Sequence, residues 1–312
     1  MTDILDLSEK LQDTSAAIAA MEAVYLRTNE SAIQETLRTL ERRRSDLEAR
    51  LSAATDAQEI EVCRYRIIKT DGAFPISVLA DSLRAFQGWL TVTFDAIKNG
   101  PKTRSRVSVE IAHQSTLEFG YAYQGSVGFV LTIPNERLLI GETDLDLTVN
   151  EMFEILRSTS SSELREHSRK VGLASIRRMH EWINAHAKAE VSADIRWSRG
   201  ETIKSDILFQ AEEAARLASI VEATSDQTAE KMTVTGFLQG ADLDARTFHL
   251  SFPEAEGTED VHGYMAKTFT APLELPLGRR YEADLVKYTV SYYAMDKDDV
   301  RWDLMALRPN TR

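Results

Sequence analysis

The sequence has one cysteine, six unclustered histidines and no long apolar run, and each shortage excludes a class of protein. Cys63 is alone among 312 residues, which excludes an intramolecular disulfide and a zinc site built from several thiolates. The most apolar stretch, 127–134, is far shorter than the roughly 18 to 20 residues of a membrane-spanning helix. Acidic residues occupy the N-terminal positions where a secretory signal would be basic. We therefore expect a soluble protein of the reducing cytoplasm.

Positive charge is also scarce. The chain carries 37 Lys and Arg against 49 Asp and Glu, for a net charge of -12 and a pI near 5.1. A general polyanion binder needs clustered basic residues to neutralise phosphates, so this balance argues against one and leaves room only for a local basic patch. The 43% hydrophobic content is enough to fill the cores of two or three domains.

Motifs of catalysis are missing. His180 and His186 share a predicted helix but lie six residues apart, whereas two zinc ligands on one helix face are four apart. No G-x-S-x-G motif marks a nucleophilic serine. The sequence therefore predicts a protein that is not an enzyme and that has no metal site and no cofactor.

The first 57 residues predict an antiparallel helical hairpin of the coiled-coil type. Apolar residues recur every three or four positions over 4–25 and again over 33–51, which places each set on one stripe of a helix. A short turn at 28–31 separates them, and Ser31 with Gln34 is typical of a capping box. The seam residues on which the prediction depends are Leu11, Ile18, Leu40 and Leu47. Arg44 also falls on the seam, where we expect it to extend to solvent or meet a carboxylate.

Residues 58–224 predict an α+β domain with an antiparallel sheet. Alternating apolar residues predict strands, and apolar residues spaced by three and four predict helices. The predicted strands are 60–69, 106–112, 115–124, 127–134 and 190–198. The predicted helices are 76–97, 147–157, 160–190 and 205–223.

Residues 231–312 predict a small β-barrel. Five strand candidates follow one another with Gly, Pro and Asp turns between them, as in an SH3-like or OB-like barrel. The polar segment 225–231 is interpreted as the linker to this third part. The expected fold is therefore α+β in three parts: a helical hairpin (1–57), a central antiparallel sheet with helices (58–224) and the barrel (231–312).

The leading functional hypothesis is a non-enzymatic cytoplasmic scaffold or adaptor. An amphipathic hairpin is incompletely buried by itself, so residues 1–57 are expected to oligomerise or to dock to a partner protein through the seam. The competing interpretation is that the hairpin packs on the chain's own middle domain. Modular chains of this kind occur in bacterial defence systems, although no residue here supports such a role.

The alternative hypothesis is a binding or sensor module in which the barrel or the central sheet recognises nucleic acid or a nucleotide-like ligand. Aromatic side chains on a barrel can stack on bases while arginines meet phosphates. The residues that carry this hypothesis are Arg279, Arg280 and Tyr281 in the barrel and Arg169 and Arg177 on the long helix. Binding that weakens steeply with added salt would support it.

Overall fold

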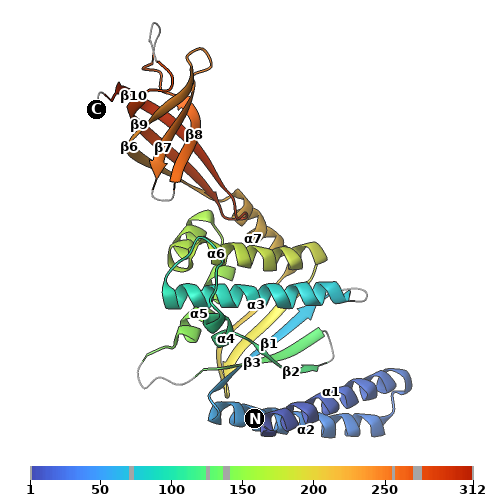
Figure 1. Cartoon of the computed structure of the whole chain (residues 1–312). Coiled ribbons are helices and arrows are strands. Elements are labelled where there is room, and N and C mark those ends of the chain that lie inside the picture. The colour runs from blue at the N-terminus through green and yellow to red at the C-terminus, as the bar shows by residue number, and fades with distance from the viewer. Residues whose placement is uncertain are drawn as a thin grey trace. The chain divides into compact units, whose positions relative to one another are not determined.

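The computed structural model describes residues 2–69, 74–123, 127–135, 141–254, 257–269 and 276–310. The chain divides into two compact units, Met1–Ala223 and Thr224–Arg312. Within the described residues, the first unit combines helices with a five-stranded antiparallel sheet, and the second is a closed barrel (Figure 1). The mixed α+β class, with an antiparallel sheet and a small barrel, is therefore confirmed.

Two long helices form the N-terminal hairpin. α1 (Thr2–Thr28) and α2 (Ser31–Ala57) lie side by side and are joined by only two residues. Asn29 has the left-handed φ of 52°, a conformation that asparagine tolerates better than most residues, so the chain can reverse at once. The capping box predicted at Ser31 and Gln34 is wrong, because Ser31 already lies in the helix and the N-cap is Glu30, with no side-chain capping bond.

The sheet of the first unit has its first strand in the middle. Its order is β2-β3-β1-β4-β5, and every neighbouring pair is antiparallel. The strands are β1 (Ile60–Ile68), β2 (Glu118–Tyr123), β3 (Val127–Pro134), β4 (Ser192–Arg199) and β5 (Thr202–Phe209). Because successive side chains of a strand point to opposite faces of the sheet, the residues of β1 alternate between two different layers of the unit.

One face of the sheet carries the helical core. Cys63, Tyr65 and Ile67 of β1 are fully buried there, and the Tyr65 ring lies 5.0 Å from that of Phe86. The helices of the unit after the hairpin are α3 (Ile76–Asn99), α4 (Val109–Gln114), α5 (Asp144–Leu156), α6 (Ser161–Ala189) and α7 (Ala211–Ala223). α6 bends at Gly172, whose φ is 76°. The hairpin covers the opposite face of the sheet (Figure 1).

Two segments of the first unit differ from the prediction. Residues 106–112 alternate in hydrophobicity, yet α4 forms there because the Ser108 hydroxyl accepts a hydrogen bond from the Ile111 amide and caps it. Residues 205–223 are predicted as one helix, yet 205–209 belong to β5 and only α7 is helical. The apolar residues near 207 satisfy both periods, so pairing with β4 decides the outcome.

The second unit is a closed barrel with the order β10-β8-β7-β6-β9. Its strands are β6 (Ser225–Asp242), β7 (Thr247–Glu254), β8 (Gly257–Met265), β9 (Arg280–Tyr292) and β10 (Asp298–Pro309). A parallel pairing of β10 with β8 closes the ring around a core that includes Leu250 and Trp302. The linker predicted at 225–231 is wrong, because this polar segment is the first part of β6 and pairs with β9.

Candidate anion-binding site

A cavity of about 400 Å³ lies between the hairpin and the sheet of the first unit. Its two walls come from different layers. The hairpin wall consists of Ser15, Ile18, Ala19, Glu22, Arg44 and Glu48. The sheet wall consists of Arg64, Arg66, Tyr121, Asp194 and Arg196. Four of these eleven residues are arginines and three are carboxylates, so the cavity has a small excess of positive charge in a chain whose net charge is -12.

Simple periodicities bring the wall residues together. Ser15, Ile18 and Glu22 follow one another at spacings of three and four, so they share one face of α1. Arg64 and Arg66 alternate with the buried Tyr65, which turns both arginines away from the helical core and toward the hairpin. The helical and strand periods therefore place these residues on facing walls.

The register of β1 with β4 places two arginines directly opposite each other. Arg64 is the cross-strand partner of Arg196, and Arg66 is the partner of Asp194. The second pair forms an ion pair with 2.7 Å between Nη2 and Oδ2. The first pair brings like charges together, an arrangement that destabilises a sheet by a few tenths of a kcal/mol up to about 1 kcal/mol. The next strand offers Asp206 opposite Arg196, but no ion pair joins them.

Several guanidinium groups of this cavity have N–H donors without a hydrogen-bond partner among the described residues. Arg44, Arg64 and Arg196 make no hydrogen bond or ion pair with any described residue. Nε of Arg66 is buried and has no hydrogen-bond partner among the described residues either. A guanidinium presents five N–H donors in a planar fork that fits the oxygens of carboxylates and phosphates. These arginines therefore suit the cavity to the binding of an oxyanion.

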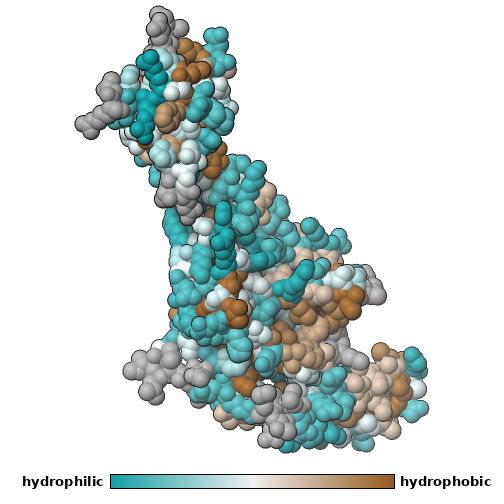
Figure 2. Space-filling model, in the orientation of Figure 1, coloured by the Kyte–Doolittle hydropathy of each residue, from teal (hydrophilic) through white to brown (hydrophobic). Residues whose placement is uncertain are grey.

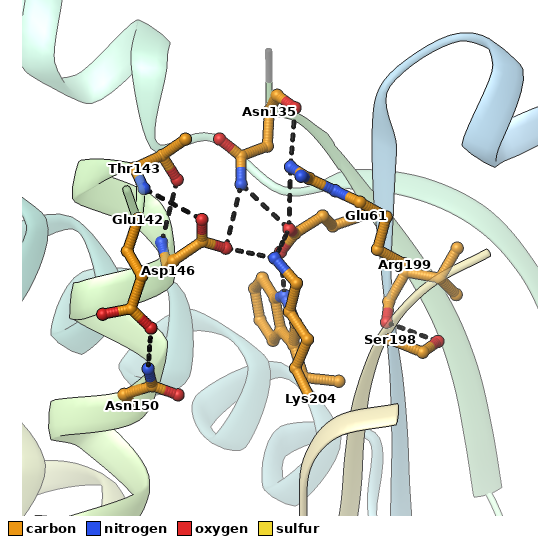
Figure 3. Close-up of polar contacts among 11 residues, drawn as sticks. Glu61, Asn135, Glu142, Thr143, Asp146, Asn150, Ser198, Arg199 and Lys204 are labelled. Atoms are coloured by element: carbon orange, nitrogen blue, oxygen red, sulfur yellow. Dashed lines mark hydrogen bonds and ion pairs between the residues drawn. The ribbon is translucent and has the colours of Figure 1, made fainter. Parts of the chain in front are cut away.

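A buried polar network on the other face of the same strands fixes their pairing (Figure 3). Glu61 of β1 is fully buried, and its carboxylate accepts hydrogen bonds from Asn135 at 2.8 Å and from Trp197. It also forms ion pairs with Arg199, at 3.0 Å, and with Lys204. A buried carboxylate is tolerated only when it is paired in this way, so the network holds β1 against β4 and β5 in one register.

The network extends to the start of α5. Lys204 forms a second ion pair with Asp146, which also closes a capping box with Thr143. Burial opposes ionisation of Asp146, but the hydrogen bonds from Lys204 and Thr143 outweigh it and lower its pKa to about 2. The carboxylate is thus charged at neutral pH and fixes Lys204 in place.

Two of the four seam residues predicted to contact a partner lie against the chain's own sheet. Leu11 and Leu47 are buried in one cluster with Val62, Tyr121 and Val130 of the sheet. Ile18 is buried and lines the cavity, while Leu40 is half-buried. Three of the four side chains are therefore buried within the single chain, and their contact with a partner stays a prediction.

Two of the residues that carry the nucleic-acid hypothesis are buried, each within its own unit. Arg279 and Arg280 are exposed on the barrel, but Tyr281 is 3% exposed and its hydroxyl donates to the carbonyl of Pro276. In the first unit Arg169 is exposed, whereas Arg177 is buried and donates to the carbonyl of Thr103. The burial of Tyr281 and Arg177 argues against base stacking and phosphate contact at these two positions.

Sequence reasoning missed Arg64, Arg66 and Arg196 as site residues, and it noticed Arg44 only as a flaw in an apolar seam. A usable signal was present: two arginines alternate with buried residues in the strand at the centre of the sheet. Charged residues seldom occupy such positions unless they are paired or functional. The pairing of β1 with β4, which opposes Arg64 to Arg196, had no signal in the sequence.

Comparisons of the chain with protein-family models, with curated proteins and with solved structures found no match. The described residues contain no group of three or more side chains that could hold a metal ion. None of the described helices combines the length and the apolar content that crossing a membrane requires.

Proposed function

We propose that the first unit binds a small phosphate-bearing ligand in the cavity between hairpin and sheet, and that the protein is a non-enzymatic binding or sensor module. The observation that carries this proposal is the pair Arg64 and Arg196, opposed on neighbouring strands and without a carboxylate partner among the described residues. A phosphate dianion between them would turn a repulsive pair into two charge-assisted interactions.

The alternative explanation, without a ligand, is that these arginines are solvated surface residues. That alternative explains Arg196, which is exposed, better than it explains Arg64, which is half-buried beneath the hairpin. A bound oxyanion accounts for both Arg64 and Arg196, because one phosphate offers enough acceptor oxygens for several guanidinium groups.

The test is a calorimetric titration of the full chain with inorganic phosphate and with pyrophosphate. We expect saturable binding that weakens in Arg64→Gln by about tenfold or more, the effect of losing a charge-assisted hydrogen bond. Arg169→Gln is the matched control, because Arg169 is an exposed arginine of the same unit outside the cavity. Absence of binding to the folded wild type, or equal loss in both variants, would refute the proposal.

A second candidate function is self-association through the hairpin, in keeping with the scaffold hypothesis. It is favoured by apolar residues exposed near the end of α1, where Leu26 is 86% and Val24 42% exposed. Figure 2 shows apolar residues at this end of the hairpin. Leu26→Asp should lower the mass measured by light scattering to that of one chain. If the wild type and Leu26→Asp have the same mass at high concentration, self-association through this end of the hairpin is refuted.

We also propose that the barrel belongs to the SH3-like or OB-like class, on strand number and closure, although such an architecture by itself transfers no function. Recognition of nucleic acid by the barrel is the weaker alternative. His249 and His262 stack at a centroid distance of 3.9 Å on a shallow surface, but Asp242 borders that surface and Asp260 lies 3.8 Å from His249. Carboxylates beside a stacking surface repel a phosphate backbone.

A further inference from the structure

The two walls of the cavity differ in the sign of their charge. On the sheet wall, three arginines outnumber the single carboxylate of Asp194. On the hairpin wall, the carboxylates of Glu22 and Glu48 outnumber the guanidinium of Arg44. Neither Glu22 nor Glu48 makes a hydrogen bond or ion pair with a described residue, so their acceptor oxygens are free. A ligand that fills the cavity therefore meets donors on one side and acceptors on the other.

The cavity is larger than one phosphate. Its volume is about 400 Å³, so a single phosphate group fills only part of it. A phosphate group held at Arg64 and Arg196 leaves most of this space open toward the hairpin wall. The rest of the ligand then lies beside Ile18 and Ala19 and within reach of the two glutamates.

We infer that the ligand is a phosphate ester of a hydroxyl-rich group, as in a sugar phosphate or a ribonucleotide. This inference rests on the proposed function and names the class of ligand for the same site. The phosphate binds Arg64 and Arg196 of the sheet, and sugar hydroxyls donate hydrogen bonds to Glu22 and Glu48 of the hairpin. Carboxylates that accept from ribose hydroxyls are a general solution for recognising this group.

A ligand with an ammonium group fits the hairpin wall less well. Arg44 stands on that wall, one helical turn before Glu48, and would repel a second cation. Neutral hydroxyl donors satisfy the glutamates without that repulsion. The mixture of one arginine and two glutamates therefore favours hydroxyls over amines.

The experiment compares inorganic phosphate with ribose 5-phosphate by calorimetry on the full chain and on Glu48→Gln. In the wild type we expect ribose 5-phosphate to bind about tenfold more tightly, through hydrogen bonds to charged acceptors. Glu48→Gln should weaken ribose 5-phosphate severalfold, because the amide is a weaker acceptor. The same change should leave phosphate unaffected or strengthen it, because it removes a negative charge. Glu48 has no partner among the described residues, so the variant should fold, which thermal unfolding checks.

The outcomes separate the inference from the proposed function. Equal affinity for phosphate and ribose 5-phosphate, or a parallel change of both in Glu48→Gln, overturns the inference and leaves anion binding in place. No binding of either compound by the folded chain overturns both. Adenosine monophosphate then distinguishes the sources of the sugar phosphate: a further gain over ribose 5-phosphate identifies a nucleotide, and equal affinity identifies a free sugar phosphate. Both results support the inference.

Discussion

Removing one of the two opposed arginines should raise the stability of the first unit when no anion is bound. It should lower the extra stability that a bound anion gives. Arg196→Gln deletes the charge that faces Arg64 across β1 and β4 and keeps a polar side chain at an exposed position. In the absence of a bound anion this change relieves repulsion and stabilises the first unit. In the presence of phosphate it removes half of the binding pair, so the anion stabilises the variant less than the wild type.

The magnitudes are measurable. Like charges directly opposite in a sheet destabilise it by about 0.2 to 1 kcal/mol, and 1 kcal/mol corresponds to about 2 to 4 °C in a unit of this size. We therefore expect the variant to melt about 1 to 3 °C higher in low salt, an effect that shrinks as salt screens the exposed pair. For the wild type, an anion at a hundred times its dissociation constant adds about 2.7 kcal/mol.

Differential scanning calorimetry of the full chain is the assay, because it measures the melting temperature and its shift on adding phosphate. Arg169→Gln supplies the control for loss of an exposed arginine outside the cavity. The reasoning is refuted if Arg196→Gln lowers the melting temperature in low salt, or if phosphate stabilises the variant as much as the wild type.

Three further predictions concern the first unit. Burial lowers the pKa of His186 from 6.5 to about 4, against the opposing bond to the Val191 carbonyl. As the pH falls from 6.5 to 4, the unfolded chain takes up a proton that the native state does not, so stability should decline by up to about 3 kcal/mol. Urea titrations should show this component missing in His186→Asn; identical pH dependence would contradict it. Gly172→Ala should destabilise by at least about 2 kcal/mol, because a Cβ there would lie 2.2 Å from the Lys102 carbonyl oxygen at a positive φ; a variant as stable as the wild type in urea would show that the bend relaxes freely. Leu11→Ala should cost about 2 to 5 kcal/mol and Leu40→Ala clearly less, since Leu11 is 1% exposed and Leu40 only half-buried; equal losses would mean that the hairpin does not pack on the sheet as described.

Much of the fold could be predicted from local patterns. The hairpin followed from apolar residues at spacings of three and four, and the barrel from alternating strands separated by turn residues. The prediction failed where one pattern fits two structures. Residues 205–209 show this: their apolar positions suit a helix, but hydrogen bonding to β4 makes them a strand.

The candidate site could not be predicted, because it depends on pairing between distant segments. Arg44, Arg64 and Arg196 are far apart in the chain, and only the antiparallel register of β1 with β4 and the packing of the hairpin bring them to one cavity. Register is set by burial across the whole sheet, including the Glu61 network, which no local window contains. Local patterns could reveal only Arg44 in the apolar seam and the two arginines that alternate with buried residues of β1.

The central place of β1 has a consequence for synthesis on the ribosome. β1 is the first strand to be made, but its partners β3 and β4 follow only at 127–134 and 192–199. Both of its hydrogen-bonding edges therefore stay open while most of the first unit is translated, and open edges invite pairing with other chains. The hairpin, complete by residue 57, is made before β1 and can shield one face of this strand, and α3, complete by residue 99, can cover the other.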